Sequence, residues 1–237
     1  MEDQNLQSKS PRRQFISNVA AGAAALGLGS LVSLDAMAGI KDNPQIYADA
    51  DEWFSKLKGK HRMVFDVPEP NGLMPFAWPL VYLMTNEKTG TPMKDSNAVV
   101  ILRHSGIPYA FNNSVWEKYK FGEIFHLNDP KTKAASIRNF MYQAKPEDFN
   151  IPGIGPAPLA INDLQGMGVM FGVCDMAMQV NSAAIAQMTK GDAAAIKKDW
   201  EANLLPGVQV LPSGVWAIGR AQEHGCGYCF AGGAPHE

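Results

Sequence analysis

Five short apolar runs, separated by longer segments, constrain the fold of this chain more than any other feature. The runs span 61–67 (HRMVFDV), 98–102 (AVVIL), 169–173 (VMFGV), 207–211 (GVQVL) and 226–231 (CGYCFA). Each run has the length of a strand, and continuous apolar runs are typical of strands buried on both faces. Strands that alternate with helices form a parallel sheet covered on both sides. We therefore predict a three-layer α/β fold with a five-stranded, mainly parallel sheet and helices on both faces.

The segments between these runs favour helices, as in a flavodoxin-like arrangement. We predict helices over 49–57, 73–85, 114–119, 134–142, 159–167, from 175 onward, 193–204 and 215–223, with a small extra strand at 122–127. Ser114 and Asp192 have the side chains of helix N-caps, and Gly225 is suited to end the helix at 215–223.

The first 38 residues have the pattern of an export signal. Arg12 and Arg13 precede a weakly apolar Ala/Gly/Leu segment that ends in Ala36-Met37-Ala38, an A-x-A cleavage site. Adjacent arginines followed by x-Phe-Ile indicate the twin-arginine export machinery, so we predict a periplasmic protein cleaved after Ala38. The mature chain then has a surface lead-in over 39–60 and a single domain over 61–237 with an insertion at about 106–158. No later segment is long and apolar enough to span a membrane.

Composition adds two constraints on function. The formal net charge of −2 gives no basic surplus of the kind that nucleic-acid binding requires. Three cysteines are too few for a disulfide scaffold, and their odd number leaves at least one thiol free or paired outside the chain. No dinucleotide fingerprint or phosphate loop is present, so we predict no cofactor, and we predict no metal site.

Cys174 is the leading candidate for chemistry. It stands where the strand at 169–173 meets the following helix, and in a parallel sheet that joint lies at the carboxyl edge, where ligand and catalytic groups collect. The positive end of the helix dipole favours thiolate over thiol there. The alternative interpretation is packing, since free cysteine is among the most buried residue types. The same edge is predicted to gather Asp66, Arg103, His104, Ser213 and Trp216.

Cys226 and Cys229 have the C-x-x-C spacing of a redox pair. On a regular strand, however, the two side chains point to opposite faces with Cα atoms roughly 10 Å apart, too far for a disulfide. A pair therefore requires Gly227 to bend the chain into a turn. The alternative is two half-buried thiols on the last strand. Because Cys226 begins that strand, we expect it far from Cys174.

Three stretches together resemble the DsrE/DsrF-like family, and its exported members with twin-arginine signals in particular. They are VVILRHSGIPYAF from Val99, the strand–Cys–helix of 169–178, and LLPGVQVLPSGVWAIGRAQEHGCGYCFAG from Leu204. The resemblance spans roughly 61–233 and implies the same five-stranded sheet, assembled as a trimer or hexamer. It also implies a cysteine that accepts and passes sulfane sulfur as a persulfide, at the position of Cys174. The export signal and the insertion depart from the cytoplasmic members.

These observations lead to three functional hypotheses. The first is a periplasmic, thiol-dependent carrier of sulfane sulfur, with Cys174 and His104 as catalytic residues and Arg103, Asp66, Ser213 and Trp216 in an edge cleft. Its partners would be a sulfur donor or acceptor protein. The second is a non-catalytic oligomer that binds a small ligand or a partner, in which Cys174 only packs. The third is a thiol–disulfide oxidoreductase that uses Cys226 and Cys229.

Overall fold

The computed structural model describes residues 44–151 and 153–233. The predicted twin-arginine signal, with its cleavage site after Ala38, lies outside these residues, as does the beginning of the predicted lead-in. None of the helices in the described part of the chain has the length and apolar character that crossing a membrane requires.

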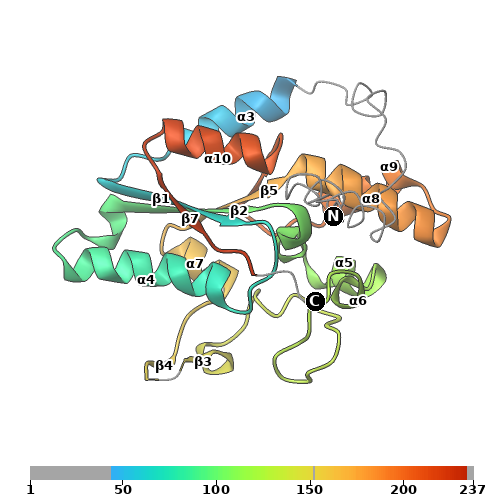
Figure 1. Ribbon diagram of the computed structural model, residues 1–237, viewed down its shortest axis with the longest axis horizontal. Coiled ribbons are helices and arrows are strands. Elements are labelled where there is room, and N and C mark those ends of the chain that lie inside the picture. Colours follow the sequence, from blue (N-terminus) through green and yellow to red (C-terminus); the bar gives the residue numbers. More distant parts are fainter. Residues whose placement is uncertain (1–43, 152, 234–237) are drawn as a thin grey trace, which may run out of the picture. The chain divides into compact units, whose positions relative to one another are not determined.

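A five-stranded, all-parallel sheet forms the centre of the fold, which confirms the predicted fold class (Figure 1). Its order is β6-β5-β2-β1-β7, and its strands are β1 (His61–Val67), β2 (Ser96–Leu102), β5 (Met170–Cys174), β6 (Val208–Leu211) and β7 (Gly227–Phe230). Each strand begins within two residues of its predicted start. The apolar runs located the strands well because burial on both faces leaves few polar positions within them.

Helices cover both faces of the sheet and give it two hydrophobic clusters. Figure 1 shows α3 (Pro44–Phe54) and α10 (Gly214–Glu223) on one side of the strands, with α4 (Met74–Lys88) and α7 (Ile161–Gly166) on the other. Val64 belongs to the cluster under α3 and α10, whereas the next residue, Phe65, belongs to the larger cluster under α4. This alternation follows from the period of two along a strand. α8 (Asp175–Thr189) and α9 (Ala193–Ala202) pack together and extend the larger cluster through Met178 and Trp200.

Side-chain caps explain where several helices begin. The Asp192 carboxylate accepts the amide of Ala194 at the start of α9, as predicted from its residue type. Ser213 caps α10 by accepting the amide of Trp216. α5 (Asn113–Lys118) is capped by Asn112, whose side chain accepts the amide of Ser114, so the prediction of Ser114 as the cap was wrong. Gly225 adopts φ +79 directly after α10, the left-handed conformation expected at a helix end.

The insertion differs most from its predicted structure. The predicted strand at 122–127 is instead occupied by the short helix α6 (Phe121–Ile124), and the predicted helix at 134–142 is absent. Phe121 and Phe125 are both buried, as the helical spacing of four residues permits. In the second segment the Asn139 amide donates to the carbonyls of Tyr109 and Phe111, a side-chain to backbone contact that competes with helix formation. The remaining short elements are η1 (Met93–Asp95), η2 (His104–Ala110), η3 (Pro146–Asp148) and the hairpin β3 (Asn150–Ile151) with β4 (Gly155–Pro156).

An aromatic cluster joins the insertion to the rest of the domain. The Phe121 ring lies 5.2 Å from that of Trp200 on α9, 5.2 Å from Phe125 and 5.9 Å from Phe111, centroid to centroid. Such pairs add about 0.5–1.5 kcal/mol beyond the burial of their area. The insertion is therefore part of the main core rather than a loose surface loop.

Candidate functional site at the carboxyl edge of the sheet

A cavity of about 220 Å³ opens at the carboxyl edge of the sheet. Four residues predicted for this edge line it, namely Arg103, His104, Cys174 and Ser213. They follow or end β2, β5 and β6, which are neighbours in the sheet. The remaining lining comes from the first two turns of α8 and the first turn of α10, through Met176, Ala177, Val180, Asn181, Gly214 and Val215. The four predicted residues at the strand ends thus line one small cavity, whose wall is largely apolar.

The Cys174 thiol stands at the start of two helices. It is the N-cap of α8, and its Sγ accepts the amide N–H of Ala177 at 3.2 Å. The amides of Gly214, the first residue of α10, and of Met176 also favour the thiolate. The side chain is only 6% exposed, and burial raises the pKa of the thiol above its ordinary value despite these amides. The helix termini thus favour the thiolate, as expected, but loss of solvation outweighs them and the pKa of the thiol is raised overall.

A buried ion pair fixes Arg103 at the rim. Its Nε and Nη2 donate to the two carboxylate oxygens of Asp66 at 2.7 and 2.9 Å, and Asp66 is 2% exposed. The hydroxyl of Tyr228 on β7 donates to the same carboxylate at 2.8 Å. The hydrogen bond with Asp66 raises the pKa of Arg103. Asp66 thus lies behind the cavity wall and holds Arg103 in place, rather than lining the cavity itself.

Close packing of α10 against Arg103 depends on Gly214. A Cβ added at residue 214 would lie 2.5 Å from the Cβ of Arg103, which real side chains do not tolerate. Only glycine therefore lets the first turn of α10 come close enough for its amide to reach the Cys174 thiol.

His104 lines the same cavity in an unusual backbone conformation. Its φ is +49, in the left-handed region that few non-glycine residues adopt, and such residues are frequent at functional sites. Its Nδ1 pairs with the hydroxyl of Ser105 at 2.9 Å. The histidine is exposed, and its partner in the structure is Ser105 rather than Cys174.

Trp216 was predicted to lie in the edge cleft, but it is not part of the cavity wall. Because α10 begins at Gly214, Val215 faces the cavity, and the next residue is rotated by about 100° around the helix. The Trp216 ring instead lies 6.2 Å from the ring of Phe54 on α3 and beneath the guanidinium of Arg220, at 5.1 Å.

Sequence reasoning missed two polar features of this edge. Tyr228 is tied to Asp66 across 162 residues, and that contact depends on the pairing of β7 with β1. Asp175, beside Cys174, is paired with Lys197 of α9 at 2.8 Å and is nearly buried. The alternation of β7 would have placed Tyr228 and Phe230 on one face, but no local pattern predicts which strand lies beside them.

The other two cysteines lie away from Cys174 and on different faces of the sheet. Cys226 is buried in the cluster under α3 and α10, where burial raises its pKa to about 11. Cys229 packs against the larger cluster on the opposite face, and burial raises its pKa as well. All three cysteines are free thiols, and β7 runs as a regular strand through Cys229. The bend at Gly227 that a redox pair would need is therefore absent.

Comparison with protein-family models, curated proteins and solved structures found no match to this chain. The resemblance to the DsrE/DsrF-like family thus stays a prediction that rests on the sequence stretches quoted above.

Proposed function

We propose that this protein carries sulfane sulfur as a persulfide on Cys174. The observation that supports this most is the position of the thiol, which borders a cavity at the carboxyl edge with amides from two helix starts directed at its sulfur. Backbone amides at helix N-termini stabilise negative charge. A persulfide anion has such a charge on its outer sulfur, and the cavity has room for one further sulfur atom beside Sγ.

The transfer requires no oxidant, reductant or cofactor. The Cys174 thiol first loses its proton, and the resulting thiolate attacks the outer sulfur of a donor persulfide, R–S–SH. The bond between Sγ and that sulfur forms while the sulfur–sulfur bond of the donor breaks, and the donor leaves as R–S⁻ and takes up a proton. The products are the Cys174 persulfide and R–SH. An acceptor thiolate then removes the outer sulfur by the same exchange and returns Cys174 to the thiol.

Arg103 and His104 are the side chains that would lie beside the reacting sulfur atoms during this exchange. Both line the cavity, and Arg103 is held by Asp66, whose carboxylate also accepts the Tyr228 hydroxyl, so that its side chain cannot swing away freely. A nearby cation favours the thiolate that must form before attack. We assign Arg103 and His104 to the approach path of the donor, with Ser213 as the cap that positions α10.

Mass spectrometry tests the proposal directly. Incubation of the protein with glutathione persulfide should add about 32 Da, one sulfur atom, and peptide mapping should place it on Cys174. Cys174→Ser should lose this addition, whereas Cys226→Ser and Cys229→Ser, as matched controls, should keep it. Addition confined to Cys226 or Cys229 would move the function to the last strand, and no addition at any cysteine would reject the persulfide proposal.

The raised pKa and 6% exposure of Cys174 favour a second candidate function. In that case the thiol only packs, and the cavity binds a small, largely apolar ligand through Met176, Val180 and Val215. Cys174→Ala would then leave function intact, while filling the cavity with Ala177→Trp would abolish it. The persulfide proposal instead requires Cys174→Ala to be inactive, so this variant separates the two candidate functions.

Two further parts of the proposal rest on the sequence. We propose that Arg12 and Arg13 direct periplasmic export, which cell fractionation of a variant with both changed to lysine would check by retention in the cytoplasm. We also propose a trimer or hexamer, as the family resemblance implies. A mass by light scattering that equals one chain would reject it.

A further inference from the structure

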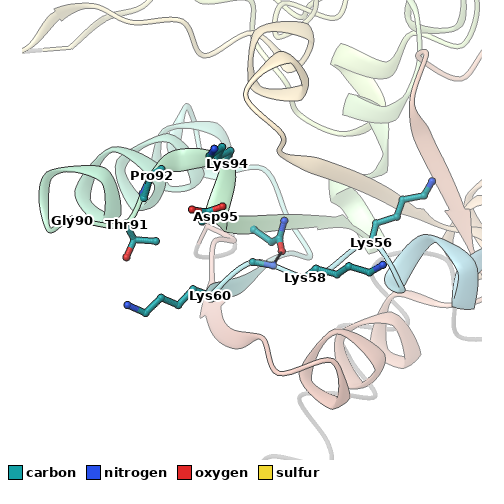
Figure 2. A pocket seen from close by; sticks show the side chains of 10 residues that line it. Lys56, Lys58, Lys60, Gly90, Thr91, Pro92, Lys94 and Asp95 are labelled. Atoms are coloured by element: carbon teal, nitrogen blue, oxygen red, sulfur yellow. Dashed lines mark hydrogen bonds between the residues drawn. The ribbon is translucent and has the colours of Figure 1, made fainter.

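A second hollow, of about 600 Å³, lies at the opposite end of the sheet from Cys174. It is bordered by the segments that lead into β1 and β2 and by the end of the α4 connection, as Figure 2 shows. We name it the lysine hollow after the four lysines in its wall, Lys56, Lys58, Lys60 and Lys94. Its size is that of a ligand pocket rather than of a gap between side chains.

Backbone contacts fix the segment that bears three of these lysines. The amide of Lys60 donates to the carbonyl of Asp95 at 2.6 Å, and the amide of Gly59 donates to Asn97 Oδ1 at 2.5 Å. A Cβ at residue 59 would lie 2.7 Å from the same Asp95 carbonyl, so glycine is needed for this close approach. The alternation of lysines in KLKGK is therefore held in position on a fixed stretch of chain.

The lysine hollow holds an excess of positive charge. Four lysines and one carboxylate, that of Asp95, border it, an excess of three positive charges on a chain whose net charge is −2. All four lysines are exposed, and across 44–151 and 153–233 none of them has a carboxylate within ion-pair distance. By contrast Lys118, Lys131 and Lys197 each have an acidic partner at 2.8 Å or less. Like charges gathered in one concavity repel one another, and a bound anion relieves that repulsion.

The residues that line the lysine hollow indicate which class of anion it can bind. Among the described residues, the wall has no arginine, which would favour planar, bidentate recognition of carboxylates, and no aromatic ring on which a nucleobase could stack. Ammonium groups bind phosphate as point charges. In Figure 2 the four ammonium groups point in different directions instead of converging, so one small anion cannot contact them together. An anion with several phosphate groups offers several separate contact points, so different phosphates can meet different lysines.

We propose that the lysine hollow binds two or more phosphate groups presented close together, independently of the thiol chemistry at the other end of the sheet. The source of the phosphates is either a soluble polyphosphate or the head groups of an anionic membrane, and the experiment separates the two.

Isothermal titration of the full chain with tripolyphosphate tests the proposal. We expect saturable binding that weakens as sodium chloride is raised, because the contacts are exposed. Binding should weaken about two- to five-fold, the range of single exposed charge contacts, in each of Lys58→Gln, Lys60→Gln and Lys94→Gln. The quadruple variant, which combines these three changes with Lys56→Gln, should not bind. Lys198→Gln, an exposed lysine on α9 without an ion pair in the described residues, is the matched control and should bind as the parent does.

Any one of three titration results would overturn the proposal. They are equal affinity for orthophosphate, equal affinity for a hexaglutamate peptide, and equal loss in the Lys198→Gln control. Sedimentation with phosphatidylglycerol vesicles separates the two sources. If the protein binds vesicles through the four lysines but does not bind tripolyphosphate, the source is a membrane. If it binds tripolyphosphate but not vesicles, the source is a soluble polyphosphate. Absence of both rejects the proposal. Cys174→Ala should leave tripolyphosphate binding unchanged, so failure here and failure of the persulfide proposal are distinguishable.

Discussion

Two opposing effects meet at the Cys174 thiol. Burial raises its pKa, while the amides of Ala177, Gly214 and Met176 lower it, and burial has the larger effect. The folded surroundings therefore favour the thiol over its nucleophilic thiolate, which forms less readily here than at an exposed cysteine. This balance makes reactivity at Cys174 a sensitive measure of its surroundings.

We predict that alkylation of Cys174 by iodoacetamide has a pH midpoint above that of the same cysteine in urea-unfolded protein. The folded state favours the uncharged thiol, so this group adds stability at pH values below its unfolded pKa and loses that contribution as the pH rises through the folded pKa. Mass spectrometry of each peptide against pH measures the midpoint. Cys226, with a pKa of about 11, provides an internal comparison. A midpoint for Cys174 below the unfolded value would contradict the balance described here.

The start of α10 shows how one element positions this site. Gly214 contacts Arg103 so closely that an added Cβ would meet it at 2.5 Å, whereas an added Cβ at Gly219, in the same helix, has open space around it. The two glycines of α10 therefore have different structural roles. Gly214 permits packing at the cavity wall, and Gly219 has no such role.

We predict that Gly214→Ala lowers the free energy of unfolding by about 1–3 kcal/mol, the usual effect of forcing atoms into a packed site. Gly219→Ala should raise it by up to about 1 kcal/mol, since alanine is the better helix former. Urea denaturation of both variants measures the difference. If the two substitutions change stability equally, the contact between α10 and Arg103 does not restrict residue 214.

Features set by local sequence could be predicted, whereas contacts between distant segments could not. The strands were predictable because each apolar run is continuous and local, and the edge that holds Cys174, His104 and Arg103 followed from parallel topology alone. The link from Tyr228 to Asp66 was not, since it depends on which strands become neighbours. Trp216 was misplaced because a helix starting at Gly214 turns it away from the cavity, an orientation that shifts with the first residue of the helix.

Long-range packing also explains the failure within the insertion. Phe111 and Phe121 are fully buried and their rings contact that of Trp200, which lies about 80 to 90 residues further along the chain. Contacts of that separation leave no periodic signal in the insertion itself, so local propensity suggested a strand and a helix that the fold does not contain. Removal of 106–158 would therefore remove part of the core rather than test a separate module.

Because the insertion shares its core with the rest of the domain, we predict that the whole domain unfolds in one transition. Phe121→Ala should lower the free energy of unfolding by about 3–5 kcal/mol, because the ring is fully buried and its loss leaves a cavity. Ile137→Ala, in the same insertion but 68% exposed, is the control and should change it by no more than about 0.5 kcal/mol. Because Phe121 packs on Trp200 of α9, intrinsic tryptophan fluorescence and far-ultraviolet circular dichroism should report one shared transition, shifted to lower urea in Phe121→Ala. Two separate transitions would instead show that the insertion folds on its own, and the aromatic cluster would then be a contact between units and not a common core.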